Sequence, residues 1–219
     1  EEPVWVAVNM VGREDNDKGH PRRFLEPIRA LRSVYPGVRL SIHGGEVDEP
    51  NEHVRDTLLL GATRVGHAFN LISDEPLLQS LRFRPFLMEI NLISNLKLEY
   101  LNRFSHHPFP EYLRLGVPVA LSTDDRGMWD TNMTDEFFVA VHHFNLSWPE
   151  VVQLSEASLS HSFLPEEEKA ERLNAFRQAL EQFMQRTLSD GIVIEPTTYK
   201  KRRAFMCSRY EVCEEKSLT

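Results

Sequence analysis

The chain has 219 residues, of which 41% are hydrophobic, so it is long enough to bury a substantial core. Its formal net charge of −8 argues against general nucleic-acid binding, because contacts with phosphates need a basic surface. It has no run approaching the roughly 18 apolar residues of a membrane helix, and its first residues do not resemble a signal peptide.

Short apolar runs rich in β-formers alternate with segments of helical periodicity. In chain order, strands are predicted at Val4 to Asn9, Val38 to Ile42, Thr63 to Gly66, Phe86 to Ile93 and Val117 to Ser122. Helices are predicted at Phe24 to Val34, Val54 to Leu60, Glu75 to Leu81 and Asp135 to Phe144. Continuous apolar strands that alternate with amphipathic helices indicate a parallel α/β sheet.

The clearest single helix is predicted from Pro165 to Leu188. Proline suits the first position of a helix, and the three glutamates that follow it favour the positive helix N-terminus. An apolar stripe at helical spacing predicts that this helix packs against the rest of the fold. The stripe consists of Ala170, Leu173, Phe176, Leu180, Phe183 and Leu188.

Gly191 is expected to end this helix, and periodicity is lost beyond it. We therefore expect two parts: residues 1–190 as the body of the fold and residues 191–219 as an appended arm or linker. The two cysteines, Cys207 and Cys213, lie in this arm. Their spacing is neither that of a C-x-x-C zinc site nor that of a disulfide scaffold, so we expect a reduced, cytoplasmic protein. The lack of a long apolar run predicts that it has no membrane partner.

Polar residues follow the predicted strands. His43 to Glu46 come after the second strand, Gly66 and His67 after the third, Ser94 and Asn95 after the fourth, and Thr123 to Asp125 after the fifth. The carboxyl ends of parallel strands meet at one rim, which is where barrel enzymes hold their active sites. We therefore expect these residues to lie together.

Chemistry suggests a hydrolytic role for this rim. Histidine and aspartate are both ligands of zinc, which in enzymes keeps one position open for water and lowers the pKa of that water towards 7. Glu46 could relay protons, and His67 could orient the attacking hydroxide. Gly44 and Gly45 let the backbone approach a flat ligand closely.

Five motifs, in order, resemble those of the adenosine deaminase family. His43-Gly44-Gly45-Glu46 is similar to H-A-G-E, Arg64 to His67 to R-[IV]-G-H, and Ser122 to Asp125 to [ST]-x-D-D. Val6 to Glu14 resembles V-x-x-D-L-A-G-x-E, and Ser162 to Lys169 resembles a late element of the same family. The resemblance covers residues 4 to about 188.

This resemblance implies a fold and an activity. The fold would be a (β/α)8 TIM-type barrel, of which this chain holds about five of the eight strand–helix units as its C-terminal portion. A closed barrel takes about 250 residues, which agrees with three units lying elsewhere. The activity would be zinc-dependent hydrolytic deamination of adenosine or deoxyadenosine to inosine and ammonia.

The resemblance also implies individual roles. His43 and Asp124 would be zinc ligands, Glu46 would protonate the purine at N1, and His67 would orient and stabilise the hydroxide. Asp125 would share a proton with N7 of the purine. The backbone N–H of Gly12 would contact N3, and Gly45 would lie against the substrate.

Part of the chain resembles the AMP deaminase branch of the same fold. His107-Pro108-Phe109-Pro110 with the Ser-Thr-Asp-Asp run is similar to a motif of that branch, and Arg126 after the aspartate pair could meet a phosphate. An adenine nucleotide (AMP or ATP) or adenine in RNA therefore remains open as the substrate.

The H-x-H of the family's first strand, which supplies two further histidine ligands, is absent from this sequence. Catalytic zinc normally has three or more protein ligands. We therefore expect the missing barrel half to come from the same, longer protein or from another chain. A non-catalytic assembly subunit, and a homo-oligomer, also remain open. The cytidine deaminase type is set aside because its H-x-E and P-C-x-x-C motifs are absent.

Overall fold

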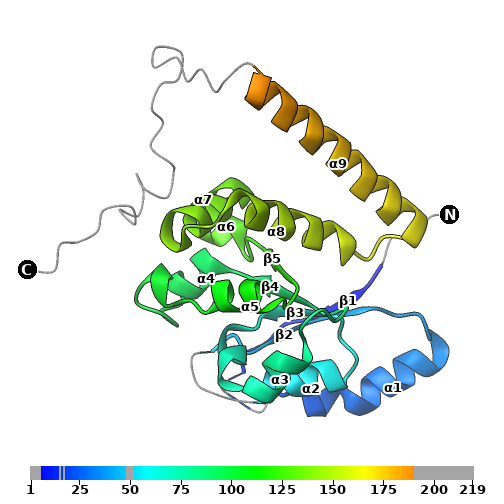
Figure 1. The fold of residues 1–219 in the computed structure, drawn as a ribbon. Coiled ribbons are helices and arrows are strands. Elements are labelled where there is room, and N and C mark those ends of the chain that lie inside the picture. Colours follow the sequence, from blue (N-terminus) through cyan, green and yellow to red (C-terminus); the bar gives the residue numbers. More distant parts are fainter. Residues whose placement is uncertain (1–5, 15, 17, 48–51, 190–219) are drawn as a thin grey trace, which may run out of the picture.

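The computed structural model describes residues 6–14, 16, 18–47 and 52–189 of the chain (Figure 1). Five parallel strands form one sheet in the order β1-β2-β3-β4-β5, so each strand pairs with its neighbours in the sequence. The strands are β1 (Val8–Met10), β2 (Leu40–Gly44), β3 (Arg64–His67), β4 (Leu87–Ile90) and β5 (Val119–Leu121). The predicted parallel α/β sheet is confirmed, and every predicted strand overlaps an observed one.

Helices connect successive strands, as a parallel sheet requires. The α-helices are α1 (Leu25–Val34), α2 (His53–Leu59), α3 (Glu75–Ser80), α4 (Leu92–Lys97), α5 (Phe109–Leu115), α6 (Arg126–Trp129), α7 (Met133–Phe144), α8 (Trp148–Ser160) and α9 (Glu166–Ser189). Short 3-10 helices are η1 (Pro21–Phe24), η2 (Phe69–Ser73) and η3 (Phe104–His106). In Figure 1, α1, α2 and α3 lie below the sheet, whereas α7 and α8 lie above it.

The prediction of a fourth strand that reaches Ile93 was wrong. The strand ends at Ile90, and α4 begins at Leu92. The buried carboxyl group of Glu136 accepts the backbone N–H groups of Leu92 (3.1 Å) and Ile93 (3.3 Å). These two donors stand at a helix N-terminus without intrahelical partners, so Glu136 satisfies them and stabilises the turn into α4.

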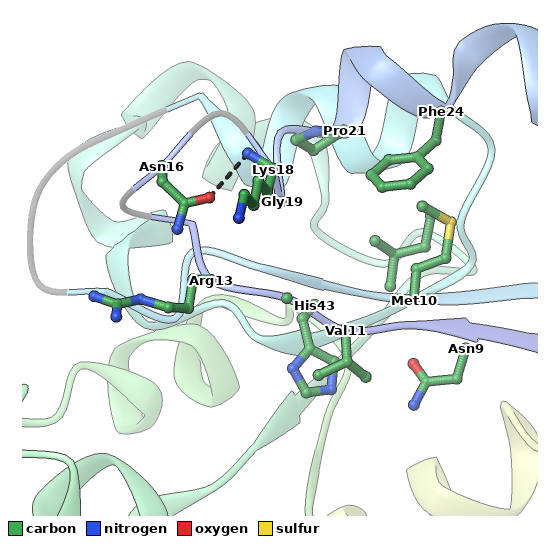
Figure 2. Close-up of a pocket in the computed structure, with 12 residues that line it drawn as sticks. Asn9, Met10, Val11, Arg13, Asn16, Lys18, Gly19, Pro21, Phe24 and His43 are labelled. Carbon is green, nitrogen blue, oxygen red and sulfur yellow. Dashed lines mark hydrogen bonds between the residues drawn. The ribbon is translucent and has the colours of Figure 1, made fainter.

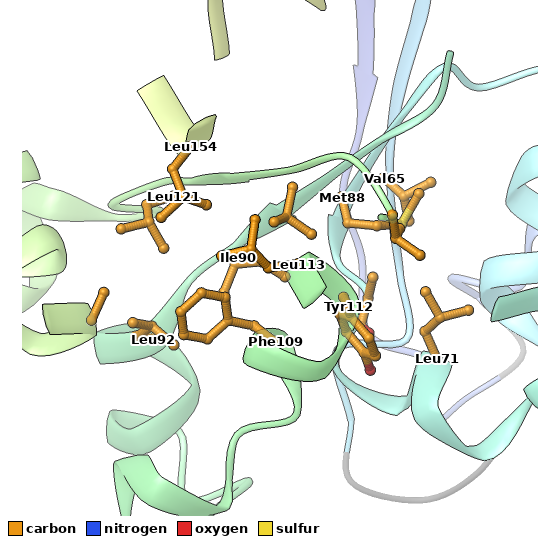
Figure 3. Packing of buried hydrophobic residues seen from close by; sticks show 14 of the residues in the cluster. Val65, Leu71, Met88, Ile90, Leu92, Phe109, Tyr112, Leu113, Leu121 and Leu154 are labelled. Carbon is orange, nitrogen blue, oxygen red and sulfur yellow. The ribbon is translucent and has the colours of Figure 1, made fainter. Parts of the chain in front are cut away.

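The main hydrophobic core lies between strands β3 to β5 and the helices that pack on them (Figure 3). Side chains of the strands, such as Val65, Met88 and Ile90, are completely buried there. They meet Phe109 of α5 and Leu154 of α8, which are also buried. This packing holds β3, β4 and β5 rigidly, and with them the residues that follow each strand.

Helix α9 occupies almost the range that was predicted, but its apolar stripe is not buried. No residue of this helix is buried, and Leu188 is 84% exposed. Its contacts run to α8, including Phe183, whose ring centroid lies 5.9 Å from that of Trp148. The expected packing is thus only partly present among the described residues, because α8 covers only one side of α9. Gly191 and the predicted arm lie outside the described residues.

Within the part of the chain that the structure describes, no helix combines the length and the apolar character needed to cross a membrane.

Candidate active site

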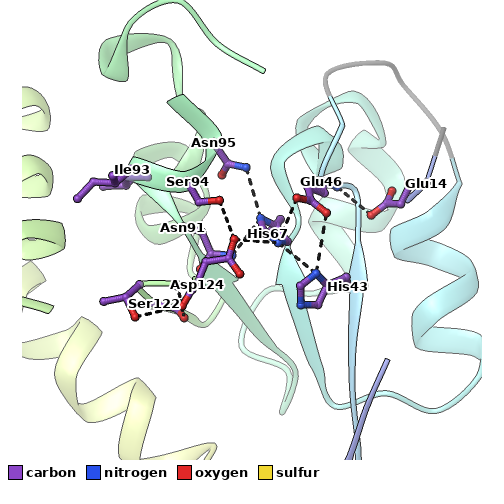
Figure 4. A network of polar contacts seen from close by, with 12 residues as sticks. Glu14, His43, Glu46, His67, Asn91, Ile93, Ser94, Asn95, Ser122 and Asp124 are labelled. Atoms are coloured by element: carbon purple, nitrogen blue, oxygen red, sulfur yellow. Dashed lines mark hydrogen bonds and ion pairs between the residues drawn. The ribbon is translucent and has the colours of Figure 1, made fainter. Parts of the chain in front are cut away.

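Four of the predicted site residues lie together at the carboxyl edge of the sheet (Figure 4). His43 belongs to β2, His67 is the last residue of β3, and Glu46 follows β2 in the loop. Asp124 lies three residues beyond the end of β5. The prediction that the polar residues after successive strands converge on one rim is confirmed for this group, which we call the rim cluster.

The side chains of the rim cluster approach one another closely. His67 Nε2 lies 3.2 Å from His43 Nδ1, 3.7 Å from Glu46 Oε1 and 4.0 Å from Asp124 Oδ2. Glu46 Oε2 lies 3.9 Å from His43 Nδ1. The rim cluster is therefore a compact group of two imidazoles and two carboxylates, with His67 at its centre.

Glycines make room for this arrangement. Gly66 pairs with His43 across the β2–β3 ladder, and a Cβ at residue 66 would lie only 2.9 Å from His43 Cδ2. Gly45 has a φ of +73°, and a Cβ there would lie 2.4 Å from Asn70 Oδ1. A left-handed, crowded position of this kind is open to glycine and strained for other residues. Gly45 thereby allows the sharp turn that brings Glu46 back towards His43.

Burial and charge act against each other in the rim cluster. Burial lowers the pKa of His67, which is completely buried. Burial also disfavours the charged form of His43, but the interactions with the carboxylates of Glu46 and Asp124 outweigh it and raise the pKa of His43. For Glu46, burial favours the neutral form, yet the two histidines lower its pKa overall. The cluster thus favours a charged carboxylate facing imidazoles.

Glu14 supports the loop that carries Glu46, and sequence reasoning did not single it out as a site residue. Its buried carboxylate accepts the backbone N–H groups of Gly45 (2.9 Å) and Glu46 (3.0 Å). The same carboxylate lies 2.9 Å from His53 Nδ1. The only signal in the sequence was the final position of Glu14 in the Val6 to Glu14 motif.

A second polar group lies behind His67, and of its members the sequence predicted only Asn95 to lie at the rim. The side-chain amides of Asn91 and Asn95 approach His67 Nδ1 at 3.0 and 3.3 Å. Asn95 in turn lies 3.3 Å from His107 Nε2. Ser94 was predicted only to lie at the rim, and its hydroxyl donates to Asp124 Oδ2 at 2.6 Å. Helix α4 and the loop before it thus hold both His67 and Asp124.

Asp125 and Gly12 lie apart from the rim cluster. Asp125 is exposed, and among the described residues no hydrogen bond or ion pair joins its side chain to the cluster. Gly12 lines a cavity of about 650 Å³ that reaches His43 (Figure 2). Arg13 and Lys18 line the same cavity. The cavity therefore connects a predicted substrate residue with the rim cluster and brings positive charge near it.

The donor set of the rim cluster suits a metal ion. Ligand atoms of His43, Glu46 and His67 all lie within 4.8 Å of one another, and Asp124 stands beside them. Nitrogen and carboxylate oxygen are ligands that zinc takes in proteins. The predicted pair of ligands, His43 and Asp124, is thus near a third and a fourth potential donor.

Comparison with known proteins places this site in a family context. The family model described as adenosine deaminase matches residues 5–179. An adenosine deaminase of Enterococcus faecalis is 30% identical over 164 residues, which cover 75% of this chain and 47% of that relative. An adenine deaminase of Chelativorans sp. is 27% identical over 176 residues, covering 78% of this chain and 51% of that relative.

Solved structures agree with the sequence comparison. An adenine deaminase from Arthrobacter aurescens superposes with a TM-score of 0.72 at 24% identity, over 80% of this chain and 53% of that one. An amidohydrolase from Burkholderia ambifaria with bound zinc gives a TM-score of 0.73 at 21% identity, over 81% and 49% of the two chains. Arabidopsis ADAL complexed with IMP gives a TM-score of 0.67 at 26% identity, over 80% of this chain and 49% of that one.

The chain spans about half the length of the curated relatives it matches. Its five parallel strands with connecting helices are those of a partial (β/α)8 TIM-type barrel, as predicted from the sequence. The three remaining strand–helix units of such a barrel are not among the described residues.

Proposed function

The chain belongs to the adenosine deaminase family, and we propose on this premise that it forms the C-terminal part of a zinc-dependent deaminase of adenosine or deoxyadenosine. The reaction replaces the 6-amino group of the purine with oxygen and gives inosine and ammonia. The observation that carries this proposal is the convergence of His43, Glu46 and Asp124 on His67, each within hydrogen-bonding or ion-pair distance of its ring.

The proposal includes one zinc ion held by His43 and Asp124. Two further histidine ligands would come from the missing barrel half, in the same protein or in another chain. The mixed nitrogen and oxygen donors of the rim cluster support this choice of metal. When bound, zinc would supply the nucleophile by lowering the pKa of a water molecule towards 7.

Glu46 and His67 handle protons and orientation in the proposed reaction. Glu46 takes up the proton that the attacking water releases and passes it to N1 of the purine while C6 is attacked. It then carries the proton of the new C6 hydroxyl to the amino group, which leaves as ammonia. Its position between the two imidazoles supports this role, since a general acid must stand within reach of the reacting atoms. His67, which is completely buried in the rim cluster, orients the nucleophile and stabilises its charge.

The purine itself is bound by residues around the rim. Asp125 shares a proton with N7, the backbone N–H of Gly12 contacts N3, and Gly45 lies against the ring. The cavity between Gly12 and His43 supports a substrate at this edge of the sheet. Asp125 is exposed, and in this proposal it contacts the purine once substrate is bound.

An adenine nucleotide is the second candidate substrate, and the charge of the cavity favours it. Arg13 and Lys18 line the same cavity as Gly12 and His43, and Arg126 is exposed directly after Asp125. Cations in these positions would attract a phosphate group. Under this alternative, Lys18→Ala or Arg126→Ala raises KM for AMP and leaves KM for adenosine unchanged.

A panel of substrates tests both candidates. The intact protein, supplied with zinc, is incubated with adenosine, deoxyadenosine, AMP and ATP, and with an adenine-containing RNA. Products are identified by liquid chromatography and mass. We expect inosine from adenosine, and loss of that product in Glu46→Ala. Conversion of AMP alone would instead identify an adenine nucleotide as the substrate. A protein that holds no zinc and binds no purine would instead be a non-catalytic assembly subunit of this fold.

A further inference from the structure

Three buried polar side chains lie on the side of His67 that faces away from His43. Asn91, Asn95 and His107 are each at most 3% exposed. They come from the loop before α4, from α4 itself and from the loop before α5. The hydrogen bonds among them determine which imidazole nitrogens carry a proton, because an N–H group can only donate and a bare ring nitrogen can only accept.

The protonation of His107 is determined by the backbone. The N–H of Phe109 points at His107 Nδ1 at 3.1 Å, so Nδ1 must be the bare, accepting nitrogen. The ring is packed edge-on against Phe69 and Phe109, with centroid distances of 5.2 and 5.9 Å. Burial lowers the pKa of His107 to about 3. The ring is therefore neutral, and its proton is on Nε2.

The proton on His107 then orients the amide of Asn95. His107 Nε2 lies 3.3 Å from Asn95 Oδ1, so the N–H donates to this oxygen. The nitrogen of the same amide is thereby directed to His67 Nδ1, also at 3.3 Å. Asn91 Nδ2 approaches the same ring nitrogen at 3.0 Å. With two amide donors directed at it, His67 Nδ1 must accept, and the proton of the neutral ring is on Nε2.

We propose that His107 is a positioning residue which, through Asn95, holds His67 in the tautomer that carries its proton on Nε2. That nitrogen faces His43 and Glu46. His67 therefore donates a hydrogen bond into the site and is not available there as a proton acceptor. The catalytic consequence of this tautomer rests on the proposed function, whereas the tautomer itself follows from the hydrogen bonds alone.

Two variants separate this role from simple packing. In Asn95→Asp, the carboxylate has no N–H to donate, so it accepts from His107 on one side and attracts a proton to His67 Nδ1 on the other. In His107→Phe, the aromatic packing is kept, but the amide of Asn95 loses the donor that orients it. Asn132→Asp is the matched control, because Asn132 is the exposed N-cap of α7, where aspartate caps equally well.

The measurement is the ¹⁵N spectrum of the imidazoles in the intact, ¹⁵N-histidine-labelled protein, with His67 assigned from His67→Gln. We expect a protonated Nε2 and a bare Nδ1 for His67 in the native protein and in Asn132→Asp. In Asn95→Asp, Nδ1 should move to the protonated range, and in His107→Phe it should move to an intermediate position. A native His67 with its proton on Nδ1, or an unchanged His67 signal in both variants, would overturn the proposal.

Measurements of kcat and KM for the same variants test whether the tautomer of His67 affects catalysis. We expect kcat of Asn95→Asp to fall by roughly ten- to a hundredfold, as when a metal ligand loses the hydrogen-bond partner that orients it, with KM nearly unchanged. An unchanged kcat in a variant whose tautomer has moved would overturn the catalytic part. The spectrum requires no turnover, so a protein that fails the substrate panel but shows the Nε2–H tautomer overturns the proposed function and leaves the tautomer assignment intact.

Discussion

The buried carboxylate of Glu14 accepts the backbone N–H of Glu46, with an N···O distance of 3.0 Å. The same carboxylate accepts the N–H of Gly45 at 2.9 Å, so the segment after β1 holds the turn after β2. Glu46 is the proposed general acid, and Glu14, more than thirty positions earlier in the chain, therefore determines its position.

Glu14→Ala should therefore reduce both stability and turnover. Each buried N–H left without an acceptor costs about 1–3 kcal/mol, so we expect a lower free energy of unfolding in urea titrations. Turnover should fall further than the unfolded fraction explains, because the Glu46 loop is no longer held.

Glu52→Ala is the control for the Glu14 variant, because the Glu52 side chain is 71% exposed and pairs with Arg22 on the surface. Surface pairs of this kind contribute about 0–1 kcal/mol. If Glu14→Ala unfolds at the same urea concentration as Glu52→Ala, the buried carboxylate does not hold the turn.

Gly66→Ala should weaken zinc binding. The added Cβ would lie 2.9 Å from His43 Cδ2, so the ring of His43 must shift away from its place in the rim cluster. We expect less zinc per protein after dialysis against limiting metal, measured by atomic emission. Gly37→Ala is the control, because a Cβ at residue 37 meets nothing within 4 Å; equal zinc contents in the two variants would contradict the prediction.

Chelation of metal should lower the melting temperature of the intact protein. A ligand that binds only the folded state at about a hundred times its Kd adds about 2.7 kcal/mol of stability. We expect Tm to fall on adding a zinc chelator and to return with excess zinc, followed by circular dichroism. His43→Ala should abolish the response; a chelator effect that persists in this variant would place the metal elsewhere.

Glu136 should make stability depend on pH. Burial raises the pKa of Glu136 to about 8, although its hydrogen bonds from Ile93 and Leu92 act in the opposite direction. In the unfolded chain the group ionises near its usual value of 4.5. The folded state thus binds the proton more tightly, and stability is lost as pH rises from about 4.5 to about 8.

Glu136→Gln removes this titration because glutamine stays neutral. The difference in free energy of unfolding between the variant and the native protein should shift in favour of the variant as pH rises from 5 to 8.5. Urea unfolding at both pH values measures this difference. Glutamine can accept only one of the two backbone N–H groups, so the variant should be less stable at pH 5. Glu111→Gln, on the exposed side of α5, is the control for the loss of a carboxylate. A stability difference that does not change with pH would contradict the raised pKa.

The sequence by itself determined the class of fold and the four residues of the rim cluster. Apolar strands and amphipathic helices have distinct periods, so their alternation was readable without a structure. His43, His67 and Asp124 could be anticipated because each lies at or just beyond the carboxyl end of a strand, and parallel strands end at the same edge. Helix α8 was missed, although Ser147 and Glu150 form a capping box at its start that the sequence displays.

Contacts between distant segments could be decided only by the tertiary structure. The strand ends at Ile90 because Glu136, far along the chain, accepts the N–H groups of α4. His107 reaches His67 only through Asn95. Local residue preferences carry no information about such pairings, because they depend on which segments the folded sheet brings together. The sequence thus identifies the groups that do chemistry, and the fold decides which hydrogen bonds hold them in place.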